Sequence, residues 1–156
     1  MTTLEIALLQ WHTNTKRTLK TLESFADENF HRQIVPNGNS PSWLFGHLAD
    51  TDDMLIELIG IRTRLYPELK NIYHHEKGTN QSGHLSKSDL IARWKTIVDT
   101  LNHSFATMSE ADWLSRHTAV SEEDFKKEPQ RNKLNVLLSR VTHKAYHLGQ
   151  IVLLPN

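Results

Sequence analysis

Two histidines four residues apart, His143 and His147, are the residues of this chain best suited to chemistry, and a third, His47, lies in another amphipathic segment. On a helix, residues at this spacing share a face, with Cβ atoms roughly 5–6 Å apart. Two such imidazoles can reach one divalent metal ion at the usual distance of about 2.0–2.1 Å. If His47 completes the set, the chain holds a three-histidine metal site with open coordination positions.

The spacing alone is weak evidence, because the chain has 10 histidines among 156 residues. Random placement gives about 0.6 pairs at the helical i,i+4 spacing, and one pair is observed. The surroundings strengthen the hypothesis, since His143 and His147 border an apolar stripe and His47 shares a face with Trp43. Three inward imidazoles are costly to bury without partners, and a shared metal ion satisfies all of them.

Four amphipathic segments with helical apolar spacing must position these side chains. In the second, Ser40 is the expected N-cap and Pro41 the first helical residue, and Pro67 ends the segment. Ser86 and Asp89 form the capping pair that starts the third. The expected helices cover residues 2–26, 40–65, 86–108 and 131–154. The core side of the last is expected at Leu134, Leu138, Val141, Ala145, Leu148 and Val152.

No useful length of sequence alternates apolar and polar residues, so we expect an all-α four-helix bundle, with residues 1–156 as a single domain. The depth of the histidines adds a constraint. His47 lies ~9 Å from the start of its helix and His147 ~10 Å from the end of its own. Their rings share a layer only if these helices are antiparallel. This predicts an up-down-down-up bundle, in which the long connection 66–85 crosses between two parallel helices.

The connections 66–85 and 109–130 are long and polar, and loops of this length are often functional. The first carries His74, His75 and His84. These histidines are expected either to shape the entrance of the site or to lie on a surface crossover.

The composition argues against several other functions. Lys plus Arg and Asp plus Glu number 18 each, so no net charge attracts nucleic acid or an anionic membrane. The apolar runs are far shorter than the roughly 20 residues of a membrane span. The chain has no cysteine, which removes disulfides and thiolate metal sites and suits a reducing cytoplasm. Its first residues lack the basic and apolar regions of a signal peptide, so none is expected. We therefore expect a cytoplasmic protein with a small-molecule substrate.

Other residues are candidates for the surroundings of the site. Asp50 and Gln150 each follow a histidine by three residues and can orient an imidazole or bound water, although Asp50 is equally well interpreted as an exposed helix acid. Arg140, one turn before the histidine pair, can hold an anionic group or extend into solvent. Trp43 and His12 are candidates for lining the pocket, and His12 is not expected to be a ligand.

Two motifs are similar to those of the DinB/YfiT-like superfamily of damage-inducible, metal-binding four-helix bundles. They are Asn39-Ser-Pro-Ser-Trp43-Leu-Phe-Gly-His47-Leu and Thr142-His143-Lys-Ala-Tyr-His147-Leu-Gly149-Gln150-Ile. The order and spacing of four helices agree over nearly the whole chain. The resemblance implies an up-down-down-up bundle, a His47/His143/His147 metal triad and, frequently, a homodimer.

Family members of known activity resemble transferases and isomerases that use low-molecular-weight thiols. The resemblance thus implies a thiol together with a divalent metal; imidazole ligands suit Zn²⁺ or Ni²⁺ first, with Fe or Mn as alternatives. A metal held by three neutral imidazoles can favour a bound thiolate or lower the pKa of bound water. The open hypotheses are a metal-dependent thiol S-transferase, a metal-dependent hydrolase, and a non-catalytic, stress-associated metal- or ligand-binding bundle.

Overall fold

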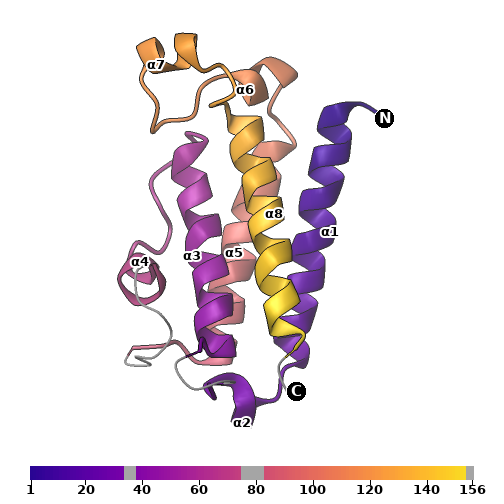
Figure 1. Cartoon of the computed structure of the whole chain (residues 1–156), viewed down its shortest axis with the longest axis vertical. Coiled ribbons are helices and arrows are strands. Elements are labelled where there is room, and N and C mark those ends of the chain that lie inside the picture. Colours follow the sequence, from indigo (N-terminus) through magenta and orange to yellow (C-terminus); the bar gives the residue numbers. More distant parts are fainter. Residues whose placement is uncertain (34–37, 75–82, 154–156) are drawn as a thin grey trace.

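The computed structural model describes residues 1–33, 38–74 and 83–153, and four long helices form its body (Figure 1). They are α1 (Thr3–Ser24), α3 (Pro41–Leu58), α5 (Lys87–Phe105) and α8 (Lys133–Ile151). The short helices are α2 (Asp27–Phe30), α4 (Glu68–Tyr73), α6 (Glu110–Leu114) and α7 (Glu122–Lys127). The part of the chain that the structure describes has no β-strand, so the predicted all-α helical bundle is confirmed.

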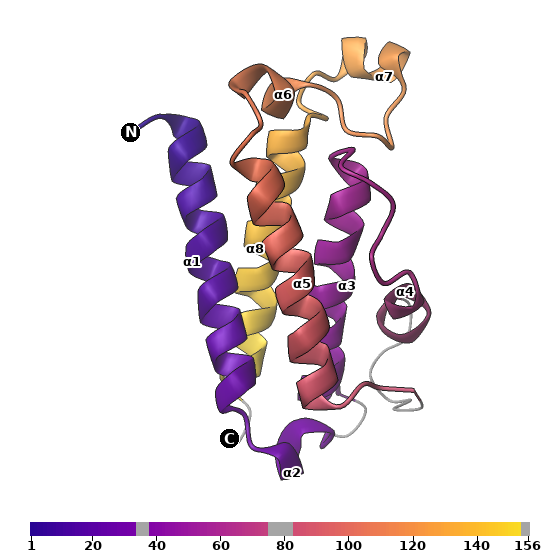
Figure 2. The ribbon, with the colours of Figure 1, turned by 180° about the vertical axis from the view of Figure 1, so that it is seen from behind.

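The long helices do not simply alternate in direction. In Figures 1 and 2, α1 and α8 descend from the end that carries α6 and α7, whereas α3 and α5 ascend toward it. The Thr118 amide donates to the Leu58 carbonyl (2.9 Å), which ties the end of α3 to the segment before α8. At the other end, the Ser42 hydroxyl in the first turn of α3 lies 2.9 Å from Nδ1 of His84, just before α5. Hence α3 runs parallel to α5 and antiparallel to α8.

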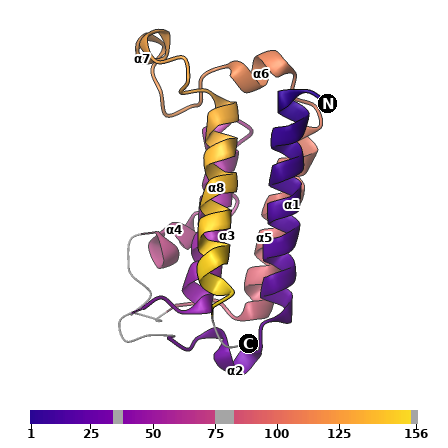
Figure 3. The same ribbon diagram turned by 45° about the vertical axis from the view of Figure 1, so that its right-hand side comes forward.

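Each long helix packs on two others: α1 and α3 both contact α5 and α8 (Figure 3). Aromatic rings fill the space between them, and Trp11 meets Phe105 edge to face with centroids 5.4 Å apart. Within residues 1–33, 38–74 and 83–153, no helix has the length and apolarity that crossing a membrane requires.

The predicted helix starts are confirmed. Ser40 Oγ accepts from the Trp43 amide at 3.2 Å, with Pro41 following directly. Ser86 Oγ accepts from the Asp89 amide at 3.1 Å. The helices α1, α5 and α8 begin and end within one to three residues of the predicted bounds; residue 154 lies outside the described residues.

The second helix ends earlier than predicted. The prediction ran to residue 65, but α3 ends at Leu58. Gly60 has a φ of 80°, a left-handed conformation that glycine adopts without a Cβ penalty. The Ile61 amide donates back to the Ile56 carbonyl (3.1 Å), as in a glycine C-cap. The chain therefore turns at Gly60, and α4 lies in the segment that we expected to be an irregular connection.

The buried face of α8 also differs from the prediction. Leu138 and Val152 are 40% and 63% exposed, and Ala145 is exposed as well. The predicted core side did not include Lys144, whose side chain is only 1% exposed and forms an ion pair inside the bundle. The buried residues of α8 are Leu137, Lys144, His147, Leu148 and Ile151.

Candidate metal centre

The three histidines lie on two helices that face each other. His47 is in the second turn of α3, and His143 and His147 are in the second half of α8. Because α3 and α8 pack side by side in opposite directions, an early position on one helix comes level with late positions on the other. The helix directions thus bring the three side chains to one layer of the bundle.

The three imidazoles face one another through their Nε2 atoms. Nε2 of His143 lies 3.2 Å from Nε2 of His47 and 3.0 Å from Nε2 of His147. All candidate ligand atoms of the group lie within 4.8 Å of one another. Two nitrogens bound to one tetrahedral ion at the usual distance are about 3.3 Å apart. This donor set and its spacing fit the ligands of a single metal ion.

Hydrogen bonds at the opposite ring nitrogens determine the tautomers. Nδ1 of His47 lies 2.9 Å from the Tyr73 carbonyl oxygen, which can only accept, so Nδ1 carries the proton. Nδ1 of His147 lies 3.0 Å from Oε1 of Gln150 and donates to it. A neutral imidazole has one N–H, so both Nε2 atoms present lone pairs to the centre of the group. This is the pattern in which metal-bound histidines are commonly held.

Burial keeps these imidazoles neutral. The His47 ring stacks on Trp43, with centroids 4.9 Å apart and planes 6° from parallel, and His147 is 8% exposed. Burial lowers the pKa of all three histidines, and that of His143 falls to about 3 because its two histidine neighbours act in the same direction. Since the neutral form binds metals, the group is ready to receive a cation at neutral pH.

Close packing between α3 and α4 positions the Tyr73 carbonyl. The Tyr73 ring lies against Gly46, where a Cβ atom would be only 2.3 Å from the ring. The Tyr73 hydroxyl accepts from the Leu85 amide at 2.8 Å. A residue without a side chain, directly before His47, therefore allows α4 to approach and bring its last carbonyl to the imidazole.

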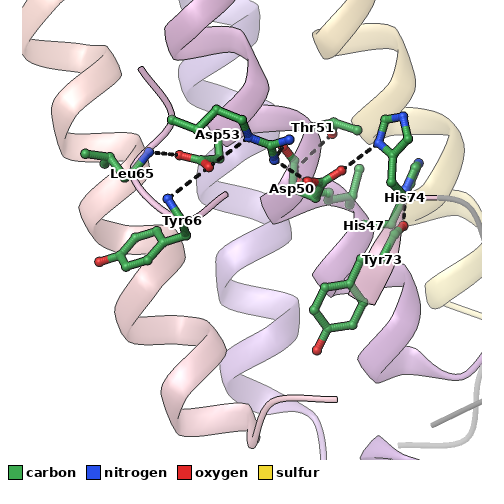
Figure 4. Close-up of polar contacts among 10 residues, drawn as sticks. His47, Asp50, Thr51, Asp53, Leu65, Tyr66, Tyr73 and His74 are labelled. Atoms are coloured by element: carbon green, nitrogen blue, oxygen red, sulfur yellow. Dashed lines mark hydrogen bonds and ion pairs between the residues drawn. The ribbon is translucent and has the colours of Figure 1, made fainter. Parts of the chain in front are cut away.

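Asp50 lies one turn along α3 from His47 and belongs to a buried polar network (Figure 4). Its carboxylate accepts from the Arg64 guanidinium and, at 2.8 Å, from Nδ1 of His74. The carboxylate is 0% exposed, so the interpretation of Asp50 as an exposed acid is wrong. The imidazole that it orients is that of His74 and not that of a candidate ligand.

Asp53 continues this network and fixes the chain that leaves α3. Its oxygens accept from the Leu65 amide (2.8 Å), the Tyr66 amide (3.1 Å) and Nε of Arg64 (3.1 Å) (Figure 4). Both amides immediately precede α4. The network therefore anchors α4 to α3 and supports the position of the Tyr73 carbonyl.

Residues 10–151 match the model of the DinB superfamily. The chain belongs to the DinB superfamily. It is similar to the crystal structure of a mutant of the mycothiol-dependent maleylpyruvate isomerase, with 19% sequence identity and a TM-score of 0.68 over 97% of this chain and 63% of that one. It is also similar to a conserved protein from Enterococcus faecalis, with 17% identity and a TM-score of 0.66 over 97% of this chain and 94% of that one. At these identities the likeness shows a shared fold. No curated protein matches the chain.

In this DinB-superfamily chain, the remaining candidate residues lie in different places. Gln150 and Trp43 contact the histidine group directly. Arg140 is partly buried, and its Nε has neither exposed surface nor a hydrogen-bond partner. His12 is exposed and lines a surface groove between α1 and α5. The prediction that His12 lines the pocket of the histidine group is therefore wrong.

Two of the three loop histidines have defined contacts. His74 donates to Asp50. Nδ1 of His84 lies 2.9 Å from the Ser42 hydroxyl, and its ring lies 5.1 Å from that of Tyr73. These contacts hold His74 to α3, and His84 to both α3 and α4. His75 lies outside the described residues.

A buried ion pair that was not predicted from the sequence lies beside the site. Nζ of Lys144 lies 2.8 Å from Oδ2 of Asp52 and 3.3 Å from the centroid of the Trp11 ring. The Trp94 indole donates to the same oxygen at 2.8 Å. Burial lowers the pKa of Lys144 to about 8, although Asp52 acts against this. The available signal was in α3, where acidic residues interrupt an otherwise apolar helix and so require buried cations.

We predict that Gly46→Ala weakens metal binding about 10- to 100-fold, the usual effect of losing an outer partner of a ligand histidine. The added methyl group displaces the Tyr73 ring and with it the carbonyl that holds His47. Metal affinity is measured by competition with a chromophoric chelator. Gly149→Ala is the matched control, because a Cβ there meets nothing within 4 Å. Equal affinities of the two variants would contradict the role assigned to Tyr73.

A second prediction concerns pH. The pKa values of His47, His143 and His147 are lowered in the folded state from 6.5, so the unfolded chain binds more protons below pH 6.5. The metal-free protein should lose stability as pH falls through this value, by up to about 1.4 kcal/mol per pH unit for each extra proton. Urea unfolding from pH 7.5 to 5 measures this slope. His143→Gln should make it shallower, and an unchanged slope would exclude His143 as its source.

Proposed function

We propose that this chain is a divalent-metal-dependent enzyme in which His47, His143 and His147 hold the metal and leave coordination positions open. One observation carries the proposal: three Nε2 atoms converge at 3.0 and 3.2 Å, and two of them belong to imidazoles whose tautomers direct a lone pair inward. Zn²⁺ and Ni²⁺ are the first candidates for imidazole ligands, followed by Fe²⁺ and Mn²⁺.

The chain's own residues prepare this site. Tyr73 and Gln150 hold two imidazoles in the ligating tautomer, and Trp43 covers one face of His47. His47 and His143 remain partly exposed, which gives a small molecule access to the centre of the group. A bound divalent ion supplies positive charge that stabilises a thiolate or hydroxide at neutral pH.

Thiol-dependent transfer or isomerisation is the reaction class that we favour, with hydrolysis as the alternative. The similar isomerase is named as mycothiol-dependent, which makes low-molecular-weight thiols the first cofactors to test. This chain spans 63% of the length of that protein, so its substrate is not assumed to be the same.

The first experiment measures metal content in protein purified without a histidine tag. We expect one equivalent of a divalent metal in the wild-type chain and its loss in His143→Ala, with the helical circular dichroism spectrum retained. His103→Ala is the matched control, because His103 is exposed on α5. The metal-loaded protein is then screened with thiols against small electrophiles, and with hydrolysable esters and amides.

The outcomes separate the hypotheses. Metal loss with a retained fold and thiol-dependent turnover is the result expected for the enzyme. Global unfolding of His143→Ala points instead to a non-catalytic bundle with a structural metal. Retention of the metal in His143→Ala would rule out the three-histidine site.

We also propose that the chain forms a homodimer through the exposed apolar side of α8. Leu138 is 40% and Val152 63% exposed on this helix, and Ala145 is exposed between them. Leu138→Lys should convert the dimer to a monomer in sedimentation velocity, because a charge in a covered apolar face lacks a partner. Leu114→Lys on α6, where the leucine is 48% exposed, is the matched control. A monomeric wild-type chain would refute this proposal.

A further inference from the structure

Arg140 is a partly buried arginine whose donors are not matched by acceptors. It lies on α8 one turn before His143, and its Nε has no exposed surface and no hydrogen-bond partner. No hydrogen bond or ion pair reaches its guanidinium from the residues that the structure describes. Arginine carries five N–H donors in a planar fork, and a buried donor without an acceptor costs free energy. The side chain is therefore suited to an acceptor that comes from outside the chain.

Two carboxylates stabilise the charge of Arg140 without a hydrogen bond to it, although Oδ1 of Asp52 has no hydrogen-bond partner. Burial lowers the pKa of Arg140, and Asp52 and Asp50 act against this. The Asp50 carboxylate accepts from two other side chains, and one oxygen of Asp52 is shared by Trp94 and Lys144. These aspartates thus act on Arg140 through space and leave its N–H groups available.

The charges of this region favour a singly charged ligand. Three buried carboxylates of α3 and three cations have a summed charge of zero. The carboxylates are those of Asp50, Asp52 and Asp53, and the cations are Arg64, Lys144 and Arg140. A divalent ion among three neutral imidazoles keeps its full charge. One carboxylate at Arg140 and one thiolate would neutralise that charge, whereas a phosphate dianion with a thiolate would leave an excess of negative charge.

We propose that Arg140 binds the carboxylate of the substrate, and that the chain acts on small carboxylic acids with an electrophilic carbon near the acid group. This inference rests on the proposed function, because it places the reacting end of the substrate at the three-histidine centre. Residues three apart on a helix have Cβ atoms roughly 5–6 Å apart. The two side chains therefore leave from the same side of α8, so that one small molecule can contact both. Arginine suits this role because its fork pairs with both oxygens of a planar carboxylate.

The test uses pyruvate as the probe and pyruvamide as its uncharged analogue, at constant ionic strength. Arginine Nε–H signals of ¹⁵N-labelled, zinc-loaded protein are followed by NMR, and the Arg140 signal is identified by its absence in Arg140→Lys. We expect pyruvate, but not pyruvamide, to shift this signal saturably. The dissociation constant for pyruvate, measured by calorimetry, should rise about tenfold or more in Arg140→Gln, which loses a charge-assisted bidentate contact. Arg140→Lys should show a smaller increase.

Arg62→Gln is the matched control, since Arg62 is exposed beyond the end of α3, and its affinity for pyruvate should equal that of the wild type. The wild-type NMR titration needs no folded glutamine variant, so it stands even if Arg140→Gln unfolds. An Arg140 signal that does not respond, or that responds equally to pyruvamide, would overturn the proposal and leave Arg140 as a counter-charge for Asp50 and Asp52. Repeating the titration on metal-free protein separates the two proposals. Pyruvate binding at Arg140 in a chain that takes up no metal would sustain the carboxylate site while refuting the metal enzyme.

Discussion

The constraint on which this structure depends is a group of three inward-facing imidazole nitrogens. Nε2 of His143 lies 3.2 Å from Nε2 of His47 and 3.0 Å from Nε2 of His147. Lone pairs at such distances repel unless a cation or a proton lies between them. Two of the rings keep this orientation because each is held at its opposite nitrogen. Nδ1 of His47 donates to a backbone carbonyl, and Nδ1 of His147 donates to Gln150. Neither ring can turn without breaking its hydrogen bond, so both lone pairs stay directed inward, as binding of a shared cation requires.

The support for this arrangement comes from outside the four long helices. The short helix α4 supplies the carbonyl for His47, and it reaches α3 only because Gly46 has no side chain. Asp53 fixes the two amides that lead into α4, and Asp50 holds both Arg64 and His74. The segment from Arg64 to His74 is thus tied to α3, the helix that carries His47. Among its described residues, the connection from α3 to α5 supplies the Tyr73 carbonyl that orients His47.

Much of this site follows from local sequence signals. The pair His143 and His147 is recognisable from its spacing, and the start of α3 is fixed by Ser40 and Pro41, since these effects act within one turn. The end of α3 was missed because Gly60 adopts a left-handed conformation that no apolar periodicity reveals. The outer partner of His47 was missed for a different reason. It is a backbone carbonyl, which every residue possesses, and its role depends on a packing contact across 26 positions of the chain.

The least expected feature, buried Lys144, explains how α8 selects its orientation. This helix has two apolar sides, one with Leu137 and Ile151 and the other with Leu138 and Val152, and they differ by a rotation of about 100°. Apolar burial alone distinguishes them poorly. An uncompensated buried lysine is far more costly than an exposed leucine, yet Lys144 finds Asp52 at 2.8 Å and the face of Trp11 beneath it. Lys144 meets Asp52 in only one rotation of α8 about its axis. The ion pair therefore favours that rotation, which also directs His143 and His147 toward His47. We infer that the pair contributes orientation more than stability: a charge in the core sets the angle at which the candidate ligands meet.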